Sequence, residues 1–63
     1  MNRNLHLIEH KDGATEAEFM TFPAYGTPHY IRRLLTMKEA ARAREIIAKS
    51  DPYEIDSFCY SIA

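Results

Sequence analysis

Three prolines divide this chain into segments, and each restricts what its neighbours can form. Proline lacks a backbone N–H, so it ends a strand or helix, but it fits the first turn of a new helix. Pro23 therefore ends the first segment. Thr27-Pro28 and Asp51-Pro52 each place a capping side chain before a proline, a combination that predicts a helix start. The prolines thus indicate one N-terminal element followed by two helices.

The first segment, residues 1–22, predicts a β-hairpin. Asp12-Gly13 lies between a stretch containing Leu5 and Leu7 and the sequence "TEAEFMTF". Glycine accepts the positive φ that tight hairpin turns require. A second possibility stays open, because Thr15 and Glu18 have the spacing of a helical capping box. A strand at residues 15–22 gives an α+β fold, and a helix gives an all-α fold.

The second segment, residues 28–49, predicts a long basic helix, because it is rich in Ala, Leu, Arg, Lys and Glu. Its apolar residues fall on two stripes of the helical wheel, and one stripe contains Ile31, Leu35 and Ile46. One small domain rarely needs two apolar stripes on a single helix. Either the helix breaks near Thr36, which begins its own capping box, or the second stripe contacts another subunit.

The third segment, residues 52–62, predicts a shorter C-terminal helix. Ile55, Phe58, Cys59 and Ile62 recur at the spacing of one buried helical face. We therefore expect a single small α+β domain spanning residues 1–63, with a hairpin, a long helix and a short helix in that order. The alternative is an all-α, helical homodimer.

The size of the chain favours self-association. It has 63 residues, and domains below about 70–80 residues usually need disulfides, a metal or a partner subunit. A single cysteine excludes an internal disulfide and indicates a reducing compartment. We expect a homodimer whose interface contains Ile31, Leu35 and Ile46. No signal peptide or membrane span is expected, which favours the cytoplasm.

The charge distribution raises the question of nucleic-acid binding. Residues 28–49 carry six Lys and Arg side chains against two Glu, although the whole chain has a net charge of −1. Phosphate is bound by clustered basic side chains, but the helix predicted at residues 52–62 is acidic, the wrong charge for a recognition helix. The usual alternative is a solvated or self-paired charged face. The candidate nucleic-acid contacts are Arg33, Lys38, Arg42, Arg44 and Lys49.

The reactive side chains do not indicate an enzyme or a metal protein. His6, His10, His29 and Cys59 are potential zinc ligands, but their spacing matches no zinc-finger pattern. Cys59 lies on the predicted buried face of its helix, which favours a buried thiol over a nucleophile. We expect no catalytic residues, no metal and no cofactor.

Aromatic side chains cluster around the sequence "PAYG". Phe19, Phe22, Tyr25 and Tyr30 could anchor a protein interface or fill the core beneath the hairpin. In so short a chain with few large apolar residues, core filling is the favoured interpretation. Some of these side chains could serve both purposes across a dimer interface.

The stretches "NLHLIEHKDG", "EFMTFPAYGTPHYIRRLLT" and "KEAARAREIIAKSDPYEIDSFCYSIA" together resemble a family of small accessory proteins of lambdoid bacteriophages. The family is encoded between the exonuclease and excisionase genes in phage lambda and its Shiga-toxin-converting relatives. The resemblance covers the whole chain and involves no chemical motif. It implies an early protein, made in the host bacterial cytoplasm, that influences the lysis-versus-lysogeny decision and prophage induction.

Two functional hypotheses follow from these observations. In the first, the protein is a non-enzymatic adaptor that binds a host or phage regulatory protein. In the second, it binds DNA or RNA directly through the Arg-rich segment 28–49. Phosphate binding depends steeply on salt, whereas an apolar protein interface does not, so the two hypotheses differ measurably.

Overall fold

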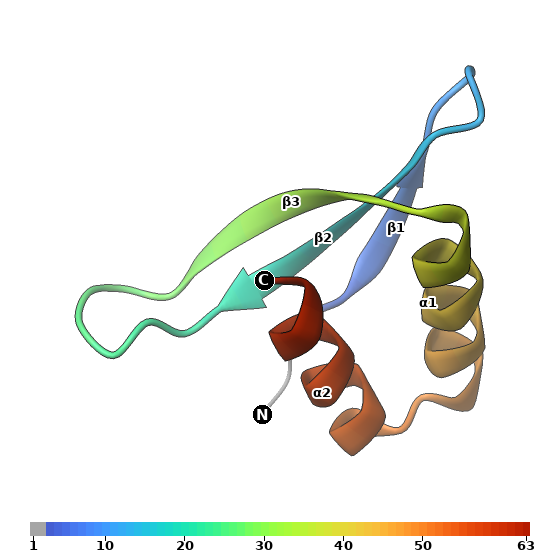
Figure 1. Cartoon of the computed structure of the whole chain (residues 1–63). Helices are drawn as coiled ribbons and strands as arrows, with labels where there is room; N and C mark the ends of the chain where they lie inside the picture. Colours follow the sequence, from blue (N-terminus) through green and yellow to red (C-terminus); the bar gives the residue numbers. More distant parts are fainter. Residues whose placement is uncertain (1–2) are drawn as a thin grey trace.

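In the computed structural model, which describes residues 3–63, three strands are followed by two helices (Figure 1). The strands form one antiparallel sheet in the order β1–β2–β3, and both helices pack against the same face of it. The predicted α+β class is therefore confirmed. The elements are β1 (His6–Glu9), β2 (Thr15–Thr21), β3 (His29–Leu35), α1 (Met37–Lys49) and α2 (Pro52–Ile62).

The predicted hairpin is confirmed, and it consists of β1 and β2. Its turn is closed by the His10 N–H, which donates to the Ala14 carbonyl at 2.9 Å, and by the Gly13 N–H, which donates to the His10 carbonyl at 3.0 Å. Gly13 has a φ of +92°, a conformation that side chains with a Cβ rarely adopt. Residues 15–21 are a strand rather than a helix, because β2 forms ladders along both of its edges.

The prediction of one helix over residues 28–49 is wrong for its first part, because α1 covers only Met37–Lys49. Residues 29–35 form β3, which pairs with β2 from His29 opposite Thr21 to Leu35 opposite Thr15. The helical propensity of this segment is a weak preference, and pairing with the free edge of β2 overrides it. Alternation along a strand places Ile31 and Leu35 on the face that carries the buried Phe19.

Of the two alternatives for residues 28–49, the structure has a boundary near Thr36, although a strand and not a helix precedes it. Thr36 Oγ1 accepts a hydrogen bond from the Glu39 N–H at 3.2 Å, and Glu39 Oε1 accepts one from the Thr36 N–H at 2.9 Å. This capping box starts α1, so the helix begins at Met37 and not after Thr27-Pro28.

The start of α2 matches the prediction. Asp51 Oδ1 accepts a hydrogen bond from the Tyr53 N–H at 2.9 Å, and Pro52 occupies the first turn. Between the helices, Ser50 adopts a left-handed conformation with a φ of 57° and ends α1. The connection between the helices is therefore short and fixed by local hydrogen bonds.

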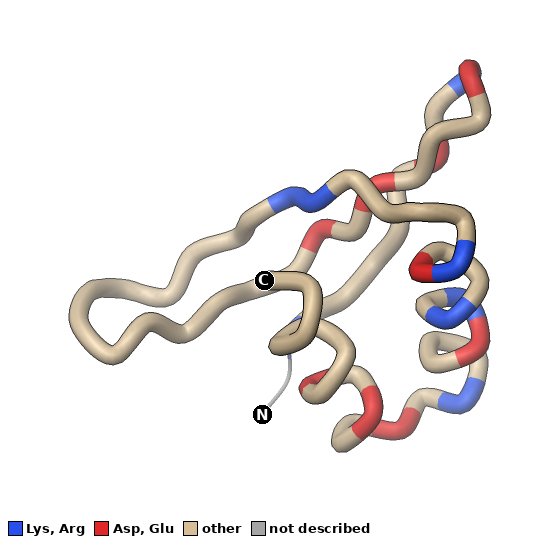
Figure 2. Tube along the Cα trace, in the orientation of Figure 1, with Lys and Arg blue, Asp and Glu red and all other residues tan. Residues whose placement is uncertain are grey.

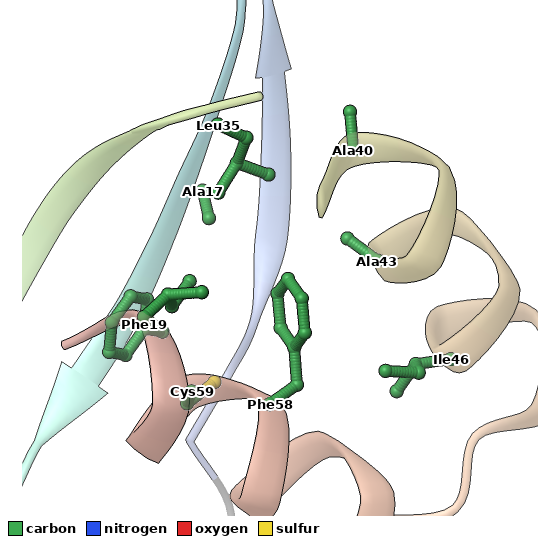
Figure 3. Close-up of a cluster of buried hydrophobic side chains, with 9 residues drawn as sticks. Ala17, Phe19, Leu35, Ala40, Ala43, Ile46, Phe58 and Cys59 are labelled. Carbon is green, nitrogen blue, oxygen red and sulfur yellow. The ribbon is translucent and has the colours of Figure 1, made fainter. Parts of the chain in front are cut away.

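The core lies between the sheet and the two helices (Figure 3). Phe19 on β2 is fully buried, and Phe58 on α2 points into the same space. Small side chains at Ala40 and Ala43 let α1 approach the sheet closely. The buried apolar residues are Ala17, Phe19, Leu35, Ala40, Ala43, Ile46, Phe58, Cys59 and Ile62.

We predict that Phe19→Ala removes most of the stability of this domain. Truncating a buried phenylalanine costs about 3–5 kcal/mol, a large part of the stability of a small domain. Tyr53→Ala is the matched control, because Tyr53 is 84% exposed and surface substitutions change stability by about 0.5 kcal/mol or less. Urea denaturation followed by circular dichroism measures the free energy of unfolding of both variants. Equal effects of the two substitutions would contradict this core.

Candidate interaction surface

The sheet face turned away from the helices carries a row of polar, ionisable side chains across all three strands. The register aligns His6, Glu18 and Arg32. Arg32 Nε donates to Glu18 Oε2 at 2.8 Å, and His6 Nε2 lies 2.7 Å from Glu18 Oε1. The hydrogen bond from Arg32 lowers the pKa of Glu18 below its usual value. The centre of this face is therefore charged but internally paired.

Apolar side chains flank that charged row. On one side Leu34, which is 65% exposed, shares a row with Ile8 and Glu16. On the other side Tyr30, which is 47% exposed, lies opposite Met20. The open face thus combines an ion-paired centre with apolar margins, the reverse of the apolar core and polar rim of a typical protein interface.

The predicted nucleic-acid contacts do not form one basic surface. Arg33 lies on β3, whereas Lys38, Arg42, Arg44 and Lys49 lie on α1. Figure 2 shows acidic residues interspersed with the basic ones along α1 and only acidic residues on α2. The long basic helix that would have placed these five side chains on one element does not exist.

Three of these basic side chains are paired with carboxylates of the same chain. Arg44 Nη2 lies 2.6 Å from Glu9 Oε1 on β1. Arg42 and Lys49 share Glu45, with N–O distances of 3.1 Å and 3.3 Å. Each such exposed pair contributes little to stability, about 0–1 kcal/mol. These ion pairs matter more for nucleic-acid binding, because a cation that is paired with a carboxylate attracts a phosphate less strongly.

Arg33 and Lys38 are different, because neither forms an ion pair within residues 3–63. Arg33 lies opposite Ala17 in the sheet register, so its side chain is on the helix-facing side of β3. Its exposed position at the outermost strand leaves the guanidinium free for an external partner.

The predicted dimer contacts are core residues of the single chain. Ile46 is 1% exposed and Leu35 is 8% exposed, and both belong to the cluster between sheet and helices. Ile31 is partly buried and packs against the same cluster. The second apolar stripe therefore needs no second subunit, because β3 and the helices cover it within one chain.

The potential metal ligands are distributed over separate sites. His6 and His10 lie beside Glu18 and Glu16, whereas Cys59 is buried in the core. Within residues 3–63, no three His, Cys, Asp or Glu side chains are grouped so as to hold a metal ion. Burial raises the pKa of the Cys59 thiol to about 11, so the thiol is protonated at neutral pH.

A cleft of about 620 Å³ separates the exposed sides of α1 and α2. Its apolar lining comes from Ile46, Phe58 and Ile62, and its charged lining includes Arg42 and Glu54. Arg42 Nη2 lies 3.6 Å from Glu54 Oε1 across this cleft. The lining residues include no histidine or cysteine. The cleft therefore offers none of the usual pairs of a nucleophile and an imidazole base.

The end of β2, the start of β3 and the loop between them, together residues 20–30, project from the body of the molecule as an arm (Figure 1). This arm contains no Lys, Arg, Asp or Glu, and Figure 2 shows it without charged positions. Tyr25 near its tip is 95% exposed, whereas Phe22 near its base is partly buried, with the Arg3 guanidinium 5.4 Å from its ring centre. Of the aromatic cluster, Phe19 therefore fills the core as expected, whereas Tyr25 is exposed.

No family model, curated protein or solved structure matches this chain. Across the part of the chain that the structure describes, neither helix has the length and apolar content needed to cross a bilayer.

We predict that Cys59 resists alkylation in the folded protein. Its side chain is fully buried and its pKa of about 11 disfavours the reactive thiolate. The folded-state pKa of Cys59 lies above the ordinary thiol value of 9.0. The thiol therefore ionises first in the unfolded chain, and the free energy of unfolding falls as pH rises from 9 toward 11. Below pH 9 this stabilisation is fully present. Iodoacetamide labelling at pH 8, with and without denaturant, measures the protection. Equal labelling rates in both conditions would contradict the buried position.

Proposed function

We propose that this chain is a non-enzymatic accessory protein of a lambdoid bacteriophage. In this proposal it acts in the host bacterial cytoplasm by binding a host or phage regulatory protein, and it thereby influences the lysis-versus-lysogeny decision and prophage induction. The sequence resemblance supports the phage context. The projecting arm with the exposed Tyr25 supports the binding role.

The observation that carries the binding role is the uncharged projecting arm. Exposed aromatic side chains such as Tyr25 supply large contact areas at protein interfaces with little loss of conformational entropy. Pro23 and Pro28, at the two ends of the loop, fix their own φ angles and so restrict its conformations. A restricted arm loses less entropy on binding than a flexible loop does.

Direct nucleic-acid binding is the second hypothesis, and the ion pairs count against it. Arg42, Arg44 and Lys49 are engaged by Glu45, Glu54 and Glu9. A phosphate backbone would have to displace these carboxylates before it could gain from the same cations. With a net charge of −1, the protein also provides little long-range attraction to nucleic acid.

A homodimer stays part of the proposal because the chain is small, but its interface would use residues other than Ile31, Leu35 and Ile46. Leu35 and Ile46 are buried within the chain, so a second copy would have to use exposed apolar side chains. Leu34 on β3 and Met37 at the start of α1, which is 91% exposed, are the available candidates. Sedimentation of the purified protein measures this assembly separately from partner binding.

We predict that a tagged form of the protein, expressed in infected bacteria, retains a stoichiometric protein partner after nuclease treatment. Tyr25→Ser should lose most of that partner, because the substitution removes the aromatic ring from the tip of the arm. Tyr60→Ser is the matched control, because Tyr60 is 79% exposed on α2, outside the arm. Pull-down followed by mass spectrometry measures recovery. Loss of all co-purifying material on nuclease treatment would favour the nucleic-acid hypothesis instead.

A further inference from the structure

Among residues 3–63, no strand neighbours the outer edge of β3. The strand order β1–β2–β3 places β3 at one side of the sheet, and Figure 1 shows no other element along its far edge. Five of its seven residues are exposed. An exposed edge of this length presents unpaired backbone N–H and C=O groups to any extended chain that approaches.

The hydrogen-bond pattern of the hairpin identifies which backbone groups are free. The His10 N–H donates to the Ala14 carbonyl, so even-numbered residues of the two strands direct their backbone groups toward each other. Inward and outward directions alternate along an antiparallel ladder. Met20, which donates to the Arg3 carbonyl, confirms that the even-numbered residues of β2 point toward β1. The odd-numbered residues therefore face β3. It follows that Tyr30, Arg32 and Leu34 direct their backbone groups toward the free edge of β3.

The opposite edge of the sheet is less accessible. β1 has only four residues. Arg44 reaches from α1 to Glu9 at the end of β1, with an N–O distance of 2.6 Å. Short edge strands and charged side chains that cover an edge both hinder strand addition. The sheet therefore offers one long free edge, and it is the edge of β3.

We propose that the free edge of β3 binds an extended acidic segment of a partner protein as a fourth strand of the sheet. This inference rests on the proposed binding function and specifies how the partner is held. Backbone hydrogen bonds to residues 30, 32 and 34 provide the attachment, as in other cases of strand addition. Side chains at the centre of β3 provide the selectivity.

The preference for an acidic segment follows from two adjacent arginines. Arg33 lies on the helix-facing side of β3 and forms no ion pair within residues 3–63, so it provides the main attraction. Arg32 lies on the open side, where its Nε already pairs with Glu18, so its attraction for a second carboxylate is weaker. Neighbouring residues of an added strand point to opposite faces of the sheet. Two consecutive carboxylates on that strand would therefore reach Arg32 and Arg33, one on each face. Opposite charges in such cross-strand positions stabilise pairing.

The same charges disfavour a second copy of this chain at the edge. Arg32 and Arg33 occupy the middle of the free part of β3. Antiparallel pairing of two β3 strands about their centres would bring arginines of both copies together. Like charges in directly opposed positions are destabilising. The edge thus favours a different chain over self-pairing.

Nuclear magnetic resonance titration of the full-length protein tests the proposal with a defined probe. The probe is a capped peptide of about ten residues, the length of a long strand, with Glu-Glu at its centre and alternating Thr and Val around it. The matched peptide carries Lys-Lys at the same positions. We expect the Glu-Glu peptide alone to bind, and the amides of Tyr30, Arg32 and Leu34 to gain protection from hydrogen exchange.

Two pairs of variants separate charge from backbone contributions. Arg33→Glu should weaken binding roughly three- to tenfold, as expected for reversal of one exposed charge contact. Lys11→Glu makes the same charge change in the distant turn, at a cation that likewise has no ion pair among the described residues, and should bind as the wild type does. Leu34→Pro removes one outward N–H and should abolish binding, whereas Leu34→Thr should retain it. Circular dichroism verifies that each variant is folded.

Several results would overturn the inference. These are no binding of the Glu-Glu peptide, equal binding of the Lys-Lys peptide, equal effects of Arg33→Glu and Lys11→Glu, or protection elsewhere in the protein. A dimer in sedimentation that Leu34→Pro dissociates would assign the edge to a second copy. Because the peptide test needs no natural partner, it is independent of the pull-down. A recovered partner that binds Arg33→Glu and Leu34→Pro normally would remove this inference and leave the proposed function intact.

Discussion

Pairing of the central strand β2 along both edges is the interaction on which the rest of the structure depends. β2 supplies Ala17 and Phe19, both fully buried, to the core. Its ladder with β3 positions Leu35, and α1 begins only two residues later, after the Thr36 cap. The place of α1 over the sheet is therefore set by the register of β3. α2 follows through a short connection and covers the remaining part of the same apolar face.

The elements with strong local signals were predictable from the sequence. Asp12-Gly13 specifies a turn, Thr36 with Glu39 specifies a helix start, and Asp51-Pro52 specifies another. β3 was missed because Leu and Arg at residues 32–35 are good helix formers, and because its partner strand lies outside the local window. The sequence "YIRRLL" also lacks the alternation of a half-buried strand, because each face receives one arginine. One signal was present: the capping box at Thr36 marks the end of the strand.

The assignment of residues 29–35 to a strand and not to a helix alters the interpretation of the surface. On a single long helix, the basic residues would be a candidate nucleic-acid surface and the second apolar stripe a dimer interface. On a strand and a helix, Arg44 instead pairs with Glu9 on β1, a contact between residues far apart in sequence. Such pairs depend on tertiary structure and no spacing rule predicts them. Arg33, which was predicted on the helix, lies instead on the edge strand β3 and forms no ion pair within residues 3–63.

The most direct test of this account is whether β2 and β3 pair in solution. Glu18 and Arg32 face each other and, by the alternation of the ladder, form a non-hydrogen-bonded pair, in which the Cα atoms are only about 4.5 Å apart. Nuclear Overhauser spectroscopy should therefore show a strong Hα–Hα contact between these residues and another between Glu16 and Leu34. Absence of both contacts, together with helical Hα(i)–HN(i+3) contacts across residues 29–35, would contradict the structure described here and restore the continuous basic helix.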